Sequence, residues 1–248
     1  MHEYLQPQLN KAVIIQINFP SKKGRYSSIN SFSEFKDLVV SSGAEITFAD
    51  KGKQSKPIPT FFISKGRALR IKDKVQEVGS DLVIFNHDLS PSQERNLEEL
   101  FKARVLDRTG LILDIFSTRA KSHVGKLQVE LAQLSHLSTR LVRGWSHLER
   151  QKGGIGLRGP GETQLETDKR LINQRIKSIK KKLNKSHKQR EVNRYSRNKS
   201  KLILVAMVGY TNAGKTTLFN VLTDNNQYAV NKLFATLDSV TRRNAVSG

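Results

Sequence analysis

The sequence of 248 residues contains no cysteine, which excludes disulfide bonds and thiolate metal sites and fits a reducing compartment. Long apolar runs are missing as well, since the longest uninterrupted run, Leu202–Val208, is far too short to span a bilayer. The stretch that precedes Lys11 has no apolar signal region. We therefore expect a soluble, cytoplasmic protein without a membrane span.

Acidic residues are scarce relative to basic ones. The sequence has 43 lysines and arginines against 22 aspartates and glutamates, a formal net charge of +21. So large an excess indicates a polyanionic partner, with nucleic acid as the first candidate and an anionic membrane surface as the second. Aromatic residues make up only 7% of the chain, which does not favour stacking on single-stranded bases. Folded RNA, contacted through its backbone, fits this composition better.

The first 108 residues alternate β-rich stretches with helical patterns, which predicts an N-terminal parallel α/β domain over residues 1–108. The predicted strands are 11–19, 45–49, 61–64, 81–86 and 104–106. The predicted helices are 31–42, 66–79 and one that begins at the Ser90–Pro91 pair. Residues 51–59 contain two prolines and predict a polar turn.

Residues 109–200 carry apolar side chains at spacings of three and four, which predicts amphipathic helices. The first pattern is interrupted at Gly144–Trp145, and the second begins near Glu162 and fades after Leu183. We expect these helices to form an antiparallel, coiled-coil-like hairpin, followed by a polar linker over 187–200.

A glycine-rich stretch lies between the two helical patterns, at Gly153–Glu162, with five glycines and one proline in ten residues. Such a loop cannot be stabilised by its own packing. It is either a flexible connector or a backbone-rich finger that approaches another surface closely, with Arg158 supplying charge. The composition leaves both interpretations open.

The segment 169–201 concentrates the positive charge, with 14 lysines and arginines and a single acid, Glu191, for a local charge of +13. A charged run is often just the solvated face of a helix. Here the charge is so one-sided that a helix without a partner would repel itself, which favours phosphate binding.

The motif GYTNAGKTT at Gly209–Thr217 fits the pattern G-x-x-x-x-G-K-[ST]. It follows the longest apolar run, which predicts a buried parallel strand, and it precedes a helical pattern. In this context the loop N–H groups and the helix N-terminus bind phosphates, Lys215 neutralises the outer phosphates, and the Thr216 hydroxyl binds Mg2+. We therefore expect residues 201–248 to begin a P-loop nucleotide-binding domain.

With these motifs in place, the chain resembles the HflX-type GTPases of bacteria over nearly its whole length. The stretch GGIGLRGPGETQLETDKR, at Gly153–Arg170, is similar to the family signature almost letter for letter. The P-loop has Thr216 where many members have serine. The segment LFATLDSVTRR, at Leu233–Arg243, resembles the first switch region, with Ser239 in place of the usual proline.

The resemblance implies a GTPase that hydrolyses GTP to GDP and phosphate and associates with the large (50S) ribosomal subunit and its rRNA. It further implies a monomer that helps to split or rescue stalled ribosomes, with the glycine-rich loop reaching towards the peptidyl-transferase centre. Lys215 is the implied catalytic residue, and Thr216 and Thr236 are the implied Mg2+ ligands, with Thr236 sensing the γ-phosphate. The implied nucleotide-binding residues are Gly209, Tyr210, Thr211, Asn212, Ala213, Gly214, Lys215, Thr216, Phe234, Ala235, Thr236, Leu237 and Asp238.

The sequence departs from the family pattern after the P-loop, where neither a DxxG nor an NKxD motif follows. The letters DRTG at Asp107 precede the P-loop, and NKLF at Asn231 lacks the aspartate that would pair with guanine. The resemblance therefore implies that the chain stops inside the nucleotide domain, and we expect these residues alone to hydrolyse GTP poorly. Two other functions stay open: a non-catalytic RNA-binding fragment with a relic P-loop, and a P-loop ATPase.

Overall fold

The computed structural model describes most of the chain in two compact units. The first unit comprises Met1–Ile115 with Val142–Lys152, and the second comprises Phe116–Leu141 with Gly153–Gly248. The described residues are 10–20, 32–151, 160–199, 205–224, 233–234, 236–238 and 240–242. Among these, only the backbone is described for 141–151, 160–165 and 196–199.

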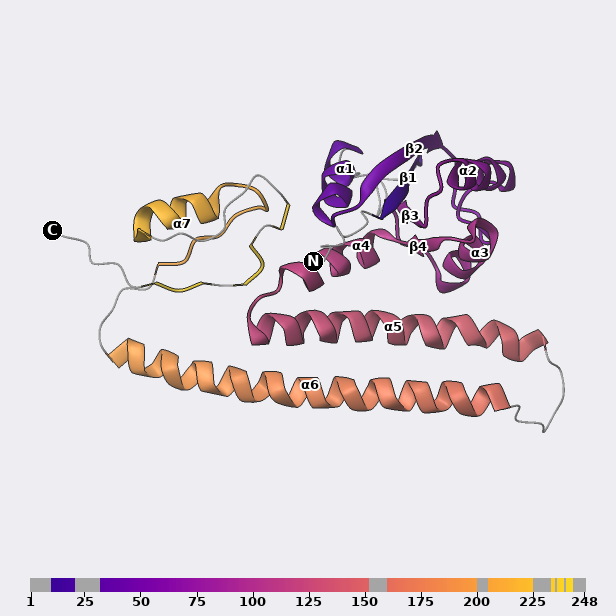
Figure 1. Ribbon diagram of the computed structural model, residues 1–248. Helices are drawn as coiled ribbons and strands as arrows, with labels where there is room; N and C mark the ends of the chain where they lie inside the picture. The colour runs from indigo at the N-terminus through magenta and orange to yellow at the C-terminus, as the bar shows by residue number, and fades with distance from the viewer. Residues whose placement is uncertain are drawn as a thin grey trace, which may run out of the picture. The chain divides into compact units, whose positions relative to one another are not determined.

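The first unit is built on a four-stranded parallel sheet in the order β2-β1-β3-β4 (Figure 1). The strands are β1 (Lys11–Asn18), β2 (Glu45–Lys53), β3 (Leu82–Phe85) and β4 (Arg104–Leu106). The helices that connect them are α1 (Phe32–Ser41), α2 (Lys65–Glu77) and α3 (Pro91–Phe101). Parallel strands require such crossovers, and the predicted parallel α/β fold is confirmed.

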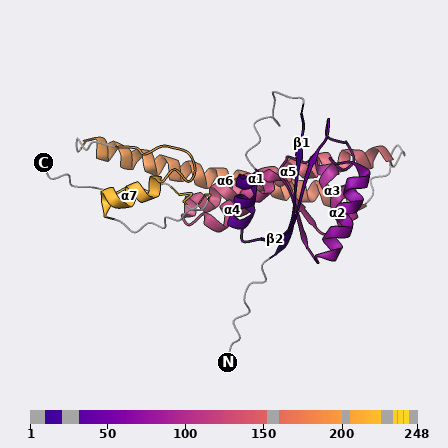
Figure 2. The same ribbon diagram turned by 90° about the horizontal axis from the view of Figure 1, so that it is seen from above.

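Both faces of this sheet are covered, because successive side chains of a strand point to opposite sides. Figure 2 shows α1 and the start of α4 (Arg108–Arg119) on one face, and α2 and α3 on the other. Val13 and Ile15 of β1 belong to one buried cluster with Ile71 of α2 and Phe101 of α3. The central strand β1 is buried on both sides, which explains its nearly continuous apolar sequence.

Helix starts in this unit follow the capping residues that the sequence supplies. Ser64 precedes α2, and its hydroxyl accepts a hydrogen bond from the Arg67 N–H at 3.4 Å. Ser90 and Gln93 form a reciprocal capping box at the start of α3, with Pro91 as the first helical residue. The predicted helix start at Ser90–Pro91 is therefore confirmed.

A polar network lies where β1 and β3 end, at the point where the strand order reverses. The Asn86 side-chain amide donates to Gln16 Oε1 at 2.8 Å, and Arg108 Nη1 donates to Asn86 Oδ1 at 2.5 Å. Arg108 Nη2 also donates to Glu34 Oε1 at 3.1 Å. These side chains bind one another across 22 to 74 positions of sequence, and so join α4 and α1 to the ends of the central strands.

His87 is buried in the same region, and its Nε2 accepts a hydrogen bond from the Ile17 N–H at 3.0 Å. The proton of the neutral ring is therefore on Nδ1. Burial lowers the pKa of His87 to about 4; the charge of Asp88 opposes this lowering, and the nearby Arg108 adds to it. The ring is neutral at pH 7 and serves as an acceptor in the core.

Two details of the first unit differ from the sequence prediction. Residues 61–64 form no strand, because their only pairing is a single antiparallel bridge between Phe62 and Ile58. Phe62 also has a φ of 65°, which a strand cannot contain. The predicted turn at 51–59 starts too early, since β2 pairs with β1 as far as Lys53.

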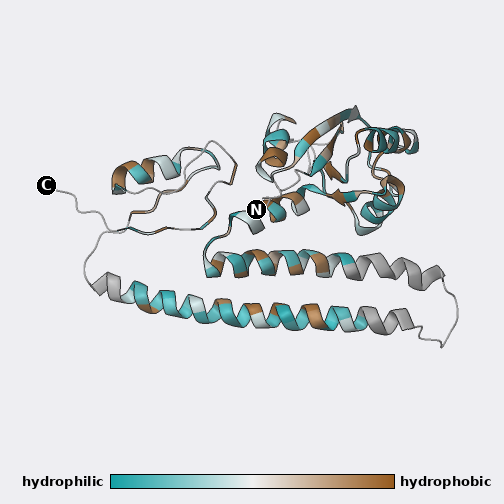
Figure 3. Cartoon of the chain, viewed as in Figure 1, coloured by the Kyte–Doolittle hydropathy of each residue, from teal (hydrophilic) through white to brown (hydrophobic). Residues whose placement is uncertain are grey.

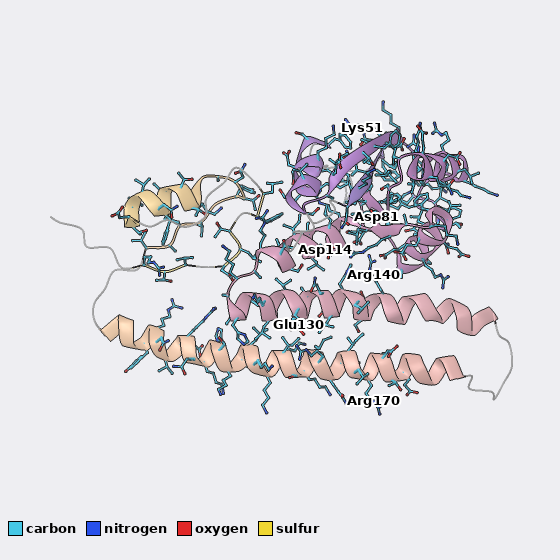
Figure 4. All side chains as sticks on the ribbon, in the orientation of Figure 1. Lys51, Asp81, Asp114, Glu130, Arg140 and Arg170 are labelled. Atoms are coloured by element: carbon cyan, nitrogen blue, oxygen red, sulfur yellow. The ribbon has the colours of Figure 1, made fainter. Side chains whose placement is uncertain are left out.

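Helix α5 (His123–Gln151) begins in the second unit, to which α6 (Pro160–Lys199) and α7 (Lys215–Thr223) also belong. The first half of α5 and the middle of α6 run side by side in opposite directions (Figures 1 and 2). Leu127 of α5 and Ile179 of α6 are buried. Arg175 Nε of α6 donates to Oε1 of Glu130 on α5, labelled in Figure 4, at 2.6 Å. The predicted antiparallel helical pair is confirmed.

Both helices end later than the sequence predicts, and the first helical pattern is divided between α4 and α5. Helix α5 continues through Gly144–Trp145, because one glycine inside a helix costs only about 1 kcal/mol and does not end it. Helix α6 continues through the segment 187–199, which was predicted to be a linker. That segment has no proline or glycine, and His187 and Glu191, one turn apart, lie 3.5 Å from each other.

Candidate nucleotide-binding site

The P-loop residues Gly209–Thr216 fold into a compact turn at the start of α7. The backbone enters the left-handed region at Asn212, with a φ of 61°, and at Gly214, with a φ of 76°. Gly214 is the N-cap of α7, and its carbonyl accepts a hydrogen bond from Leu218 at 3.0 Å. The loop therefore leads directly into a helix N-terminus, whose exposed N–H groups bind anions.

The middle of the loop is closed by its own backbone. The Ala213 N–H donates to the Tyr210 carbonyl at 3.4 Å, across a turn that contains Thr211. The Tyr210 side chain is 91% exposed, so the loop presents main chain rather than an apolar side chain to its interior. Short residues at these positions let phosphate oxygens approach the backbone closely.

The Lys215 ammonium bends back across the loop that precedes it. Its Nζ donates to the Gly209 carbonyl at 2.8 Å and also to the Tyr210 carbonyl. An ammonium group has three N–H donors, so these bonds hold it over the loop with capacity for a phosphate oxygen. The catalytic role of Lys215 stays a prediction.

The two predicted metal ligands come together, although 20 positions separate them in the sequence. Thr216 Oγ1 and Thr236 Oγ1 lie 3.1 Å apart. Octahedral Mg2+ binds oxygen at about 2.0–2.1 Å, so two adjacent ligands of one ion are separated by about 2.9 Å. The hydroxyl pair therefore has the spacing, and the oxygen chemistry, of adjacent magnesium ligands.

The predicted switch segment, Phe234–Asp238, makes contacts at both of its ends. The ring of Phe234 meets that of Phe116 edge to face, with centroids 5.0 Å apart. The carboxylate of Asp238 accepts hydrogen bonds at the start of α5, from Lys121 and Ser122. The structure thus places Asp238 against α5, a contact that the sequence did not suggest. Leu237 is half-buried, and Ala235 lies outside the described residues.

The strand predicted at 202–208 is absent from the described part of that segment. Residues 205–208 have no regular structure, and Val205 and Val208 are 81% and 90% exposed. A strand requires a partner for its N–H and C=O groups, and no neighbouring strand pairs with it in the described part of the second unit. Residues 202–204 lie outside the described range.

In the middle of α6 the basic residues are exposed, whereas the apolar residues Ile179 and Leu183 are buried or half-buried. Ile179 is 1% exposed, and Leu183, one turn later, is half-buried. Lys180, Lys181 and Lys182 between them are all exposed. Figure 3 shows α6 as predominantly hydrophilic along its coloured length. None of the helices in the described residues is long and apolar enough to cross a membrane.

Residues 153–159 of the glycine-rich loop lie outside the described residues. The choice between a connector and a finger, and the role of Arg158, therefore stay predictions. Residues 160–162 form the first turn of α6.

Three family models match successive parts of the chain. Residues 30–117 match the N-terminal region of a GTP-binding GTPase, and 119–197 match the middle region of a GTP-binding GTPase. Residues 204–248 match a model described as a 50S ribosome-binding GTPase. The GTPase HflX of Escherichia coli (strain K12) is 55% identical over 233 residues, which cover 94% of this chain and 54% of that protein. The chain belongs to the HflX family of GTPases.

Other HflX proteins agree with this assignment. The GTPase HflX of Magnetococcus marinus is 44% identical over 234 residues, again covering 94% of this chain and 54% of the relative. The chain thus spans about half the length of these HflX relatives. A crystal structure of a protein named SsGBP in complex with GDP aligns with a TM-score of 0.52 at 22% identity, covering 87% of this chain and 56% of that one. That likeness shows a shared fold.

Proposed function

We propose a function for a protein that contains this chain and has the full length of its HflX relatives, and we call it the completed protein. The completed protein binds GTP with Mg2+ and hydrolyses it. It acts as a monomer in the cytoplasm, where it binds the large ribosomal subunit and helps to split stalled ribosomes. The nucleotide part rests on the P-loop turn, over which Lys215 folds back, and on the Thr236 hydroxyl, which lies 3.1 Å from Thr216 Oγ1. The family assignment selects GTP over ATP.

The residues divide the work of phosphoryl transfer between them. Backbone N–H groups of Gly209–Thr216 bind the phosphate chain, and Lys215 balances the charge that grows on its outer end. Thr216 and Thr236 would hold the magnesium ion, which when bound supplies positive charge to the β- and γ-phosphates. Because Thr236 lies on the switch segment, its hydroxyl reports whether a γ-phosphate is present.

The helical pair supplies the RNA-binding surface of this proposal. Its lysines are exposed on α6 on the side away from the apolar residues that face α5. Backbone phosphates of folded rRNA match a surface of this kind, since it carries many cations and few aromatic rings. The domain boundaries at residues 108 and 200 remain part of the proposal.

Nucleotide binding tests the enzyme part directly. We expect the completed protein to bind and hydrolyse GTP in preference to ATP, and to require Mg2+. Lys215→Ala should abolish turnover, whereas equal turnover of GTP and ATP would favour a P-loop ATPase. Co-sedimentation of the completed protein with isolated large subunits, and with small subunits as a control, tests the ribosomal part.

One observation favours a second function for these 248 residues taken alone. Apolar side chains around the P-loop are exposed, among them Val208 at 90% and Val221 at 76%. No residue of α7 is buried, so little packing holds the P-loop in place, and these residues would bind RNA through α6 without catalysis. RNA binding by these residues, in the absence of GTP turnover that Lys215→Ala removes, would support this alternative.

A further inference from the structure

The switch segment makes an unexpected contact with the start of α5, inside the second unit. The Lys121 and Ser122 N–H groups each donate to Asp238 Oδ2 at 2.8 Å. The Ser122 hydroxyl donates to Asp238 Oδ1 at 2.5 Å and accepts the Gly125 N–H at 2.9 Å. Ser122 is therefore the N-cap of α5. Asp238 binds the N–H groups of Lys121 and Ser122 and the hydroxyl of this N-cap residue.

The contact has the chemistry of a strong intramolecular anchor. The first turn of a helix carries unpaired N–H groups and a partial positive charge, and a carboxylate that accepts several such bonds is stabilised in its ionised form. The Asp238 carboxylate accepts three such bonds, two from backbone N–H groups and one from the Ser122 hydroxyl.

Thr236 lies between two anchors of the same short segment. Two residues before it, Phe234 packs edge to face against Phe116 at the end of α4. Two residues after it, Asp238 binds the start of α5. A segment of two residues spans at most about 7 Å, so fixing both neighbours restricts the places that Thr236 can occupy. The place it takes is 3.1 Å from Thr216 Oγ1.

We propose that Asp238 is a positioning residue, which anchors the switch segment to the start of α5 so that the Thr236 hydroxyl faces Thr216. This inference rests on the proposed function, because it takes Thr236 as a magnesium ligand in the GTP-bound state. It adds a direct connection between the nucleotide site and the helix that begins the helical pair. Linkage is reciprocal, so GTP with Mg2+ stabilises the start of α5, and a change at the start of α5 alters GTP affinity.

Gly125 allows the anchor to be tested from the opposite side of the contact. A Cβ atom at Gly125 would overlap Asp238 Oδ1 and lie 2.9 Å from Ser122 Oγ, so the carboxylate would have to move away. Alanine is a better helix former than glycine, so Gly125→Ala favours α5 while it displaces Asp238. Gly66 of α2 provides the matched control, because a Cβ there meets nothing within 4 Å.

The test uses the completed protein and compares a non-hydrolysable GTP analogue with GDP at limiting Mg2+. Losing the charge-assisted bonds should weaken analogue binding about tenfold or more in Asp238→Asn and in Gly125→Ala. GDP affinity should stay within about twofold, because GDP has no γ-phosphate for Thr236 to sense. The controls Asp224→Asn and Gly66→Ala should match the parent protein for both nucleotides.

Hydrogen exchange at the start of α5 provides the second readout. The GTP analogue should slow exchange at Lys121 and Ser122 in the parent protein, but not in Asp238→Asn. Equal losses of GDP and analogue affinity, or unchanged affinities in both variants, would overturn the positioning role. Thr236→Ala separates the two claims. If it leaves analogue affinity unchanged, the ligand assignment and the positioning role both fail; if it weakens affinity and Asp238→Asn does not, only the positioning role fails.

Discussion

The exposed lysines of α6 give the sharpest test of RNA binding. We consider the replacement of Lys180, Lys181 and Lys182 together by glutamine, which keeps helix propensity and removes three charges. Successive residues of a helix are about 100° apart. The buried side of α6 is taken as the direction midway between Ile179 and Leu183 around the helix axis. Lys181 then lies about 180° from this direction, and Lys180 and Lys182 lie about 80° from it on either side.

This geometry sets the expected size of the effect. An RNA surface lying on the outer side of α6 contacts Lys181 and one flanking lysine, which makes two phosphate contacts. Each contact contributes about 0.7–0.9 to the log–log salt slope, and about four- to fivefold in affinity near 0.15 M salt. The triple variant should therefore lower the slope by about 1.4–1.8 and the affinity about 20-fold, and Lys181→Gln alone by about half of each on a logarithmic scale.

The assay is binding of the completed protein to isolated large subunits over a series of salt concentrations. A charge-preserving variant, with arginine at the same three positions, should keep the slope of the parent protein. Circular dichroism confirms that the helices of each variant are intact. A glutamine variant that is folded and has an unchanged slope would refute phosphate contact by this part of α6.

Three further outcomes are expected. Lys215→Ala in the completed protein should remove GTP turnover but leave RNA binding within about twofold of the parent protein, measured by co-sedimentation without nucleotide. A parallel loss of turnover and RNA binding would indicate that the P-loop supports the fold of the RNA-binding part. The 248 residues alone should hydrolyse GTP far more slowly than the completed protein, and equal rates in a phosphate-release assay would contradict the need for the second switch. Stability of the first unit should fall by roughly 3 kcal/mol between pH 6.5 and pH 4, because the unfolded chain protonates His87 at its ordinary pKa of 6.5 while the folded protein does so only near 4. Hydrogen exchange of the Ile17 amide across this range measures that loss, and His87→Gln should flatten it.

Local signals predicted much of the fold correctly. The helix start at Ser90–Pro91 and the apolar spacing that ends at Leu183 each depend on a few neighbouring residues, so the sequence displays them directly. The P-loop motif is equally local, and it led to Lys215 and Thr216. The resemblance to HflX proteins supplied Thr236, which no local pattern would have singled out.

The contacts that were missed join residues far apart in the chain. Asp238 meets Ser122 across 116 positions, and Asn86 meets Gln16 across 70. Neither pair has a spacing or motif that marks it, because the fold alone brings the partners together. The prediction of a strand at 202–208 was wrong at 205–208 for a related reason. An apolar run becomes a strand only where a neighbouring strand pairs with it.

The central claim is that Thr216 and Thr236 hold magnesium for GTP hydrolysis beside Lys215. The most direct measurement is the Mg2+ dependence of GTP turnover by the completed protein, with Thr216→Ser and Thr216→Ala compared side by side. Serine keeps the hydroxyl, so it should support turnover at a similar Mg2+ concentration. Alanine removes the ligand, so turnover should be lost or shifted to at least about tenfold higher Mg2+. Parent-like turnover by Thr216→Ala at low Mg2+ would contradict the assignment of the metal site.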